Sequence, residues 1–208
     1  MKKEAKTRFF VSAAALLLLP VLAFAHPGHG AEDALHADAG FLDGLVHPFT
    51  GLVHPFTGLD HLAAMLAVGV WSALAVRPVW LAPAAFVALL TAGATAGFLG
   101  VAVPAVEPMI AASLLVLGLL VAWRRHLAMP LAAGLAGAFA FFHGAAHGTE
   151  LGGSGQWLAL AGMVIATAAL HATGIALGHA VIARHRWLAV MAGASTALLG
   201  ATLLVRMA

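Results

Sequence analysis

The sequence predicts an all-α, polytopic integral membrane protein with about six transmembrane helices after a cleavable signal peptide. Of its 208 residues, 62% are hydrophobic and only 9% are charged, a balance typical of integral membrane proteins. The apolar residues fall into six stretches, most of which approach the ~20 residues that cross a hydrocarbon core. Nearly all the charged residues lie outside these stretches or at their ends.

Residues 1–25 have the pattern of a secretory signal peptide. Four basic residues within the first eight positions precede an apolar run over 9–21, and Ala23-Phe24-Ala25 fits an A-x-A cleavage site. The mature chain then begins at His26; the alternative is an uncleaved first helix. Cleavage removes four of the ten Lys and Arg residues, so the mature chain is nearly neutral and lacks the basic surface that binds nucleic acid.

The mature chain divides into a polar lead-in over 26–58 and a six-helix transmembrane domain over 59–208. In the lead-in, His26 and His29 are candidates for accessory metal capture. The expected spans are 59–76, 79–103, 109–123, 127–147, 157–180 and 187–205. The third is short, so it must tilt less or thin the bilayer locally. Small residues should allow close helix packing, for example at Gly93, Gly97, Gly174 and Gly178.

The lead-in contains a tandem repeat, because the heptad GLVHPFT occurs at 44–50 and again at 51–57. The repeat is either a replication slip or the addition of a further accessory ligand, His47. We expect the second copy, with His54, to be the working one, because the run Leu-Asp-His follows only that copy. The proline in each copy argues against a continuous helix through the repeat.

The charges between the spans predict their orientation. Signal cleavage leaves the mature N-terminus outside, so the inside connections hold five arginines: Arg77, Arg124, Arg125, Arg184 and Arg186. The outside connections hold Glu107 and Glu150 without Lys or Arg, and only Arg206 near the C-terminus falls outside. This distribution follows the positive-inside rule. We therefore expect a membrane protein whose mature N-terminus lies outside.

A first polar cluster, made of His54, Asp60 and His61, opens the first span. Inserting an Asp near a bilayer centre costs about 2.5–3.5 kcal/mol of free energy. A polar cluster at this place therefore indicates a function that offsets the cost. Imidazole and carboxylate groups together bind divalent transition metals. Asp60 is either a ligand or the acceptor that fixes the tautomer of His61. The structural alternative is that Asp60 caps the helix and His61 packs between helices.

A second cluster, His143, His147 and Glu150, lies toward the outer end of the fourth span. The two histidines are four residues apart, so both lie on one helix face and can bind one ion. The predicted topology brings both clusters to the same membrane level. In the fifth span, His171 is a candidate for the inner station of an ion path. The alternative is a neutral His171 that is hydrogen-bonded across helices.

Three ordered motifs then carry a resemblance over nearly the whole chain. The stretch HPxxGxDHxxAMxAVG occurs at 54–69, FHGxAHGxE at 142–150 and LHxxGxxLG at 170–178. With these motifs the chain resembles the HupE/UreJ family of nickel/cobalt permeases. It departs from the family pattern at Ala63-Ala64, where a Leu-rich pair is common, and in the doubled heptad, which leaves open which copy holds the family's histidine. The resemblance implies six helices, periplasmic metal entry and support for nickel enzymes such as hydrogenase or urease.

The expected function is therefore secondary transport of Ni²⁺ or Co²⁺, with the metal as cargo and without a prosthetic group. The sequence has no Cys, which excludes thiolate sites, and no G-x-x-x-x-G-K-[ST] run for ATP. The alternatives are a non-transporting metal-binding accessory protein and a His-box metalloenzyme, which the absence of any His-His pair disfavours. The expected partners are the metal ion and the lipid bilayer. The choice of metal, the energy coupling and homo-oligomer formation stay open.

Overall fold

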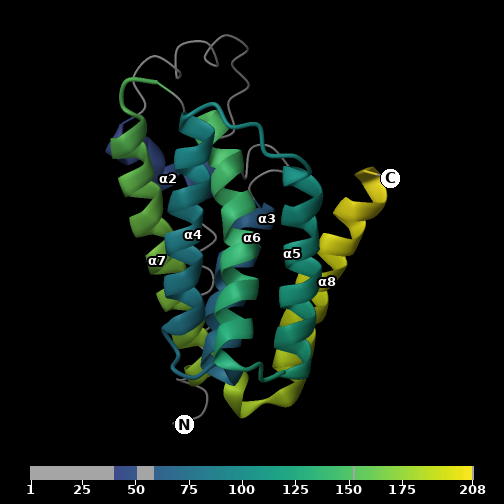
Figure 1. Cartoon of the computed structure of the whole chain (residues 1–208). Coiled ribbons are helices and arrows are strands. Elements are labelled where there is room, and N and C mark those ends of the chain that lie inside the picture. The colour runs from purple at the N-terminus through teal and green to yellow at the C-terminus, as the bar shows by residue number, and fades with distance from the viewer. Residues whose placement is uncertain (1–39, 51–58, 152, 208) are drawn as a thin grey trace, which may run out of the picture. The chain divides into compact units, whose positions relative to one another are not determined.

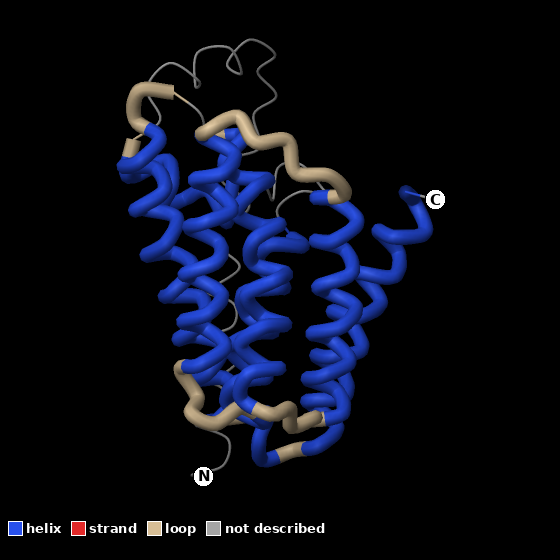
Figure 2. The backbone as a smooth tube through the Cα atoms, viewed as in Figure 1, coloured by secondary structure: helices blue, strands red, loops and turns tan. Residues whose placement is uncertain are grey.

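A computed structural model of the chain describes residues 40–50, 59–151 and 153–207, and every regular element in these ranges is a helix (Figures 1 and 2). The predicted signal peptide, His26, His29 and His54 lie outside the described residues. The helices are α2 (Phe41–Thr50), α3 (Leu59–Ala75), α4 (Leu81–Phe98), α5 (Val106–Trp123), α6 (Met129–Glu150), α7 (Gln156–Ala180), the short 3₁₀ helix η2 (Ile182–Arg184) and α8 (Arg186–Met207).

Five of these helices, α4 to α8, are long and apolar enough to cross a membrane. They confirm the all-α membrane class that the sequence predicts. The remaining expected span corresponds to α3, an apolar helix of 17 residues that falls just short of the length of the other five. Three turns of its inner face are nonetheless buried among the other helices, because Met65, Val68 and Trp71 are fully inaccessible to solvent.

The third expected span is longer in the structure than the sequence predicts. That span, α5, begins at Val106 rather than at residue 109 and has 18 residues, one more than α3. Glu107 and Pro108 both lie in its first turn. The N–H groups of a first turn have no partner within the helix, so a proline there removes no hydrogen bond. A glutamate there is favourable because the N-terminal end of the helix dipole is positive.

The helices pack in pairs along their lengths, α4 on α6, α5 on α8 and α3 on α7. The first two pairs lie side by side in Figure 1. Small residues permit these close approaches. A Cβ atom added at Gly174 of α7 would lie 2.5 Å from the carbonyl oxygen of Leu66 in α3, and one added at Gly97 of α4 would lie 2.8 Å from the backbone of Gly148 in α6. The predicted small-residue packing at Gly93, Gly97, Gly174 and Gly178 is thereby confirmed.

Helix α2 covers part of the lead-in that the sequence did not predict to be helical. Pro48 lies in its last turn, where the ring removes one internal hydrogen bond. The helix packs against α7 through Gly44 and Gly162. A Cβ atom at either glycine would overlap the backbone of the opposite helix. This contact brings His47, one turn beyond Gly44, over the helical bundle.

The two ends of the bundle differ in charge. The upper end in Figure 1, where α4 and α6 end and α5 and α7 begin, carries Glu107 and Glu150. The lower end carries Arg77, Arg124, Arg125, Arg184 and Arg186, and beside them the exposed side chains of Trp80, Trp123 and Trp187. Interfacial tryptophans beside arginines are typical of one boundary of a membrane-spanning bundle.

Candidate metal site

The upper end of the bundle buries a group of histidines from separate helices. His61 of α3 is 6% exposed, and His143 and His147 of α6 are 0% and 3% exposed. His47 of α2 approaches them from the side. Ionisable side chains at this depth in an apolar bundle are expensive and are a functional candidate by default.

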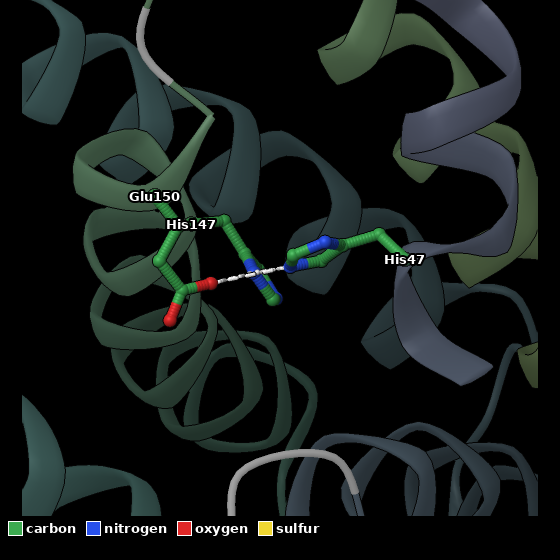
Figure 3. Close-up of side chains that lie close together, drawn as sticks. All are labelled: His47, His147 and Glu150. Carbon is green, nitrogen blue, oxygen red and sulfur yellow. Dashed lines mark hydrogen bonds and ion pairs between the residues drawn. The ribbon is translucent and has the colours of Figure 1, made fainter. Parts of the chain in front are cut away.

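Three of the polar groups converge on one point (Figure 3). His47 Nε2 lies 2.9 Å from His147 Nδ1 and 3.2 Å from Glu150 Oε2, and His147 Nδ1 lies 3.4 Å from the same oxygen. Ligands bonded at about 2.1 Å to one ion at angles of 90–110° lie about 3.0–3.4 Å from each other. These three atoms, which we call the triad, therefore have the spacing of one face of a coordination sphere.

The imidazole rings continue from the triad into the bundle as a chain. The ring centroids of His47 and His147 are 4.7 Å apart, those of His147 and His61 are 4.4 Å apart, and those of His61 and His143 are 4.7 Å apart. His143 and His147 lie one turn apart on α6, as the spacing of four residues predicts. We refer to His47, His147, His61 and His143 as the upper cluster.

Asp60 supports His61 from within the same turn of α3. Its Oδ1 accepts the backbone N–H of His61 at 2.7 Å and lies 2.9 Å from His61 Nδ1. A carboxylate can only accept here, so Nδ1 carries the hydrogen and Nε2 keeps its lone pair. Within the described part of the chain, that buried Nε2 has no hydrogen-bond partner. Of the two roles left open by the sequence, the geometry favours an acceptor that fixes the tautomer.

His171 of α7 lies apart from the upper cluster and is 2% exposed. The buried ring of Phe86 separates them, with centroids 5.6 Å from His143 and 5.0 Å from His171. Among the described residues, neither ring nitrogen of His171 has a hydrogen-bond partner. The described residues therefore do not form the alternative that the sequence left open, in which His171 is hydrogen-bonded across helices.

A cavity of about 460 Å³ opens at the upper end beside the upper cluster. Asp60, His61, Glu107 and Glu150 contribute to its lining, so three carboxylates face the same space. A divalent cation with six waters of about 30 Å³ each fits such a volume. The cavity can therefore admit a hydrated cation to the neighbourhood of the triad.

The structure brings together five of the residues that the sequence singled out: Asp60, His61, His143, His147 and Glu150. His47, expected only as an accessory ligand, lies in the triad. Sequence reasoning missed two neighbours of the cluster, Phe86 and Ser113. A lone hydroxyl in α5, which is otherwise apolar after its first turn, was the available indication for Ser113.

Comparison with known proteins identifies a family and a relative that this chain resembles. The family model described as HupE / UreJ protein matches residues 14–53 and 49–203. The chain belongs to the HupE/UreJ family. The two matched segments of this HupE/UreJ chain overlap inside the doubled heptad, as expected if the family pattern has a single copy. Protein HupE of Rhizobium leguminosarum bv. viciae is 42% identical over 194 residues, which cover 92% of this chain and 94% of the relative. No solved structure matches.

Proposed function

We propose that this HupE/UreJ-family protein is a secondary permease that takes up Ni²⁺ or Co²⁺ across the bacterial inner membrane. The observation that carries the proposal is the triad of His47, His147 and Glu150, because its atoms have ligand spacing at one end of an apolar helical bundle. The nickel/cobalt assignment rests on the family resemblance. The protein would thereby supply nickel enzymes such as hydrogenase or urease.

The proposed orientation has the mature N-terminus and the upper end of the bundle in the periplasm. The arginines at the opposite end support it through the positive-inside rule. Residues 1–25 would be removed as a signal peptide. His54, outside the described residues, stays a predicted further ligand, and His26 and His29 stay predicted accessory groups.

In the proposed path, the hydrated cation enters the acidic cavity and exchanges water for the triad atoms. It then passes along the imidazoles of His61 and His143 and beyond Phe86 to His171. A divalent cation that enters a negative-inside cell gains about 4.6 kcal/mol per 100 mV, twice the value for a single charge. The membrane potential can therefore drive uptake without ATP.

The test is uptake of radioactive nickel and cobalt into proteoliposomes with an imposed inside-negative potential. We expect potential-dependent uptake by the wild type and a loss of at least about tenfold in Glu150→Gln, which removes the charged ligand of the triad. The matched control is His126→Ala, because His126 is exposed in the loop before α6 and far from the triad in sequence. Metal binding without potential-driven uptake would contradict the permease and support an accessory protein.

A further inference from the structure

Ser113 is the single hydroxyl-bearing residue of α5, and it is fully buried. Its Oγ lies 2.6 Å from the carbonyl oxygen of Ile110, one turn earlier on the same helix. The same Oγ lies 3.0 Å from Nε2 of His143 on α6. The hydroxyl thus joins one ring of the upper cluster to the backbone of a neighbouring helix.

The hydrogen of this hydroxyl can be assigned from its two neighbours. A hydroxyl has one hydrogen to donate, and a carbonyl oxygen has none. The short contact with Ile110 therefore uses the hydrogen of Ser113, and the hydroxyl oxygen offers only lone pairs to His143. Nε2 of His143 must then be the donor. The neutral ring keeps its lone pair on Nδ1, which is buried and has no hydrogen-bond partner in the described ranges.

We propose that Ser113 is a positioning residue of the metal path: it holds His143 in the tautomer whose Nδ1 binds the passing ion. The inference rests on the proposed function only in taking the ion to be a divalent transition metal. Partners on the second nitrogen of a metal-binding histidine fix its tautomer and orientation, and their loss typically weakens metal affinity 10–100-fold.

The neighbouring ring shows the complementary arrangement. Asp60 accepts from Nδ1 of His61 and leaves Nε2 as its lone-pair atom, whereas Ser113 accepts from Nε2 of His143 and leaves Nδ1. The two rings meet nearly perpendicular, at an interplanar angle of 88° and a centroid distance of 4.7 Å. Opposite tautomers in adjacent rings therefore give each imidazole one unpartnered buried nitrogen.

Ser72 provides a matched control for this role. It is a serine of α3 and, like Ser113, is 0% exposed. Its Oγ has no hydrogen-bond partner in the part of the chain that the structure describes. Ser72→Ala therefore makes the same chemical change in the same degree of burial without removing a hydrogen bond to a histidine.

The experiment titrates the purified full-length protein with Co²⁺ and follows its visible ligand-field spectrum. We expect Ser113→Ala to bind Co²⁺ about 10–100-fold more weakly and with an altered spectrum, while Ser72→Ala matches the wild type. Ser113→Thr keeps the hydroxyl and is expected to restore the spectrum. Wild-type affinity and spectrum in a folded Ser113→Ala protein would overturn the proposal.

A second measurement needs no variant. Nitrogen-15 spectra of histidine in the metal-free wild type are expected to show His143 protonated on Nε2. A hydrogen on Nδ1 of His143 would overturn the proposal whatever the variants do. Neither measurement depends on transport. If the protein binds Co²⁺ through a His143 that Ser113 orients, but transports no metal, the proposed function is contradicted and this inference is not.

Discussion

The upper cluster and His171 are both buried histidine sites in one bundle, but their surroundings differ. In the cluster, His61 contacts Asp60, His143 contacts Ser113 and His147 contacts Glu150. His171 has an aromatic edge contact with Phe86, but neither of its nitrogens has a hydrogen-bond partner within the described residues. Supported imidazoles are oriented to bind an ion, whereas an unsupported one binds it less tightly.

This difference suits a permease. An ion path needs binding that is strong enough for entry and weak enough for release. The carboxylates lie at the upper end, around the cavity and the triad, where an incoming cation would lose its water in the proposed path. His171, deeper in the bundle, has none of that support. The comparison predicts that the upper cluster determines affinity and that His171 affects passage.

The largest effect is expected from His147→Ala, because His147 belongs both to the triad and to the chain of rings. Its removal takes a ligand from the triad and separates His47 from His61. We expect Ni²⁺ affinity to fall by at least about 100-fold, the upper end of the cost of losing a supporting group alone. Isothermal titration calorimetry of the purified protein measures the Ni²⁺ affinity. An affinity close to that of the wild type would show that the triad is not the binding site.

A smaller loss is expected when α2 is displaced from α7. A Cβ atom in Gly44→Ala would overlap the carbonyl of Ala159, so α2 must move away and withdraw His47. We expect Ni²⁺ affinity to fall about tenfold, less than in His147→Ala, because His47 is displaced from the triad rather than removed. Gly134→Ala is the control, because a Cβ atom there has no heavy atom within 4 Å among those considered. Equal affinities for the two variants would exclude a contribution of α2 to the site.

The smallest effect on binding is expected from His171→Leu, which should instead change stability. A buried imidazole without hydrogen bonds costs about 1–3 kcal/mol, and a leucine of similar size removes that cost. We expect the thermal midpoint of the detergent-solubilised protein to stay equal or rise. His143→Leu breaks the contact with Ser113 and should lower it. A lower thermal midpoint for His171→Leu than for His143→Leu would contradict the difference between the supported upper cluster and the unsupported His171.

The sequence predicted those features that depend on local composition. The spans, the close approach at Gly174 and the shared face of His143 and His147 all follow from apolar length, small residues and helical periodicity. It did not predict α2, because the proline of the heptad argued against a helix. The docking of α2 depends instead on Gly162, which lies more than one hundred residues away along the chain.

Contacts of the histidines with separate helices were likewise not predictable from the linear sequence. His54 was favoured over His47 because Asp60 follows the second copy of the heptad, yet His47 lies in the triad and His54 lies outside the described residues. The contact between Ser113 and His143 joins two helices, and the lone hydroxyl of α5 does not by itself indicate which residue it meets. For His143 a contact between two helices decides which ring nitrogen keeps its lone pair, whereas for His61 the adjacent Asp60 of the same helix does so.

The most direct test of the central claim compares binding and uptake of radioactive nickel by His171→Leu and the wild type. The same purified samples are assayed for equilibrium binding in detergent and for potential-driven uptake in proteoliposomes. The predicted result is unchanged binding with most of the uptake lost, because the upper cluster is intact and the inner station is absent. Wild-type uptake by His171→Leu, or a loss of binding that matches its loss of uptake, would contradict the account.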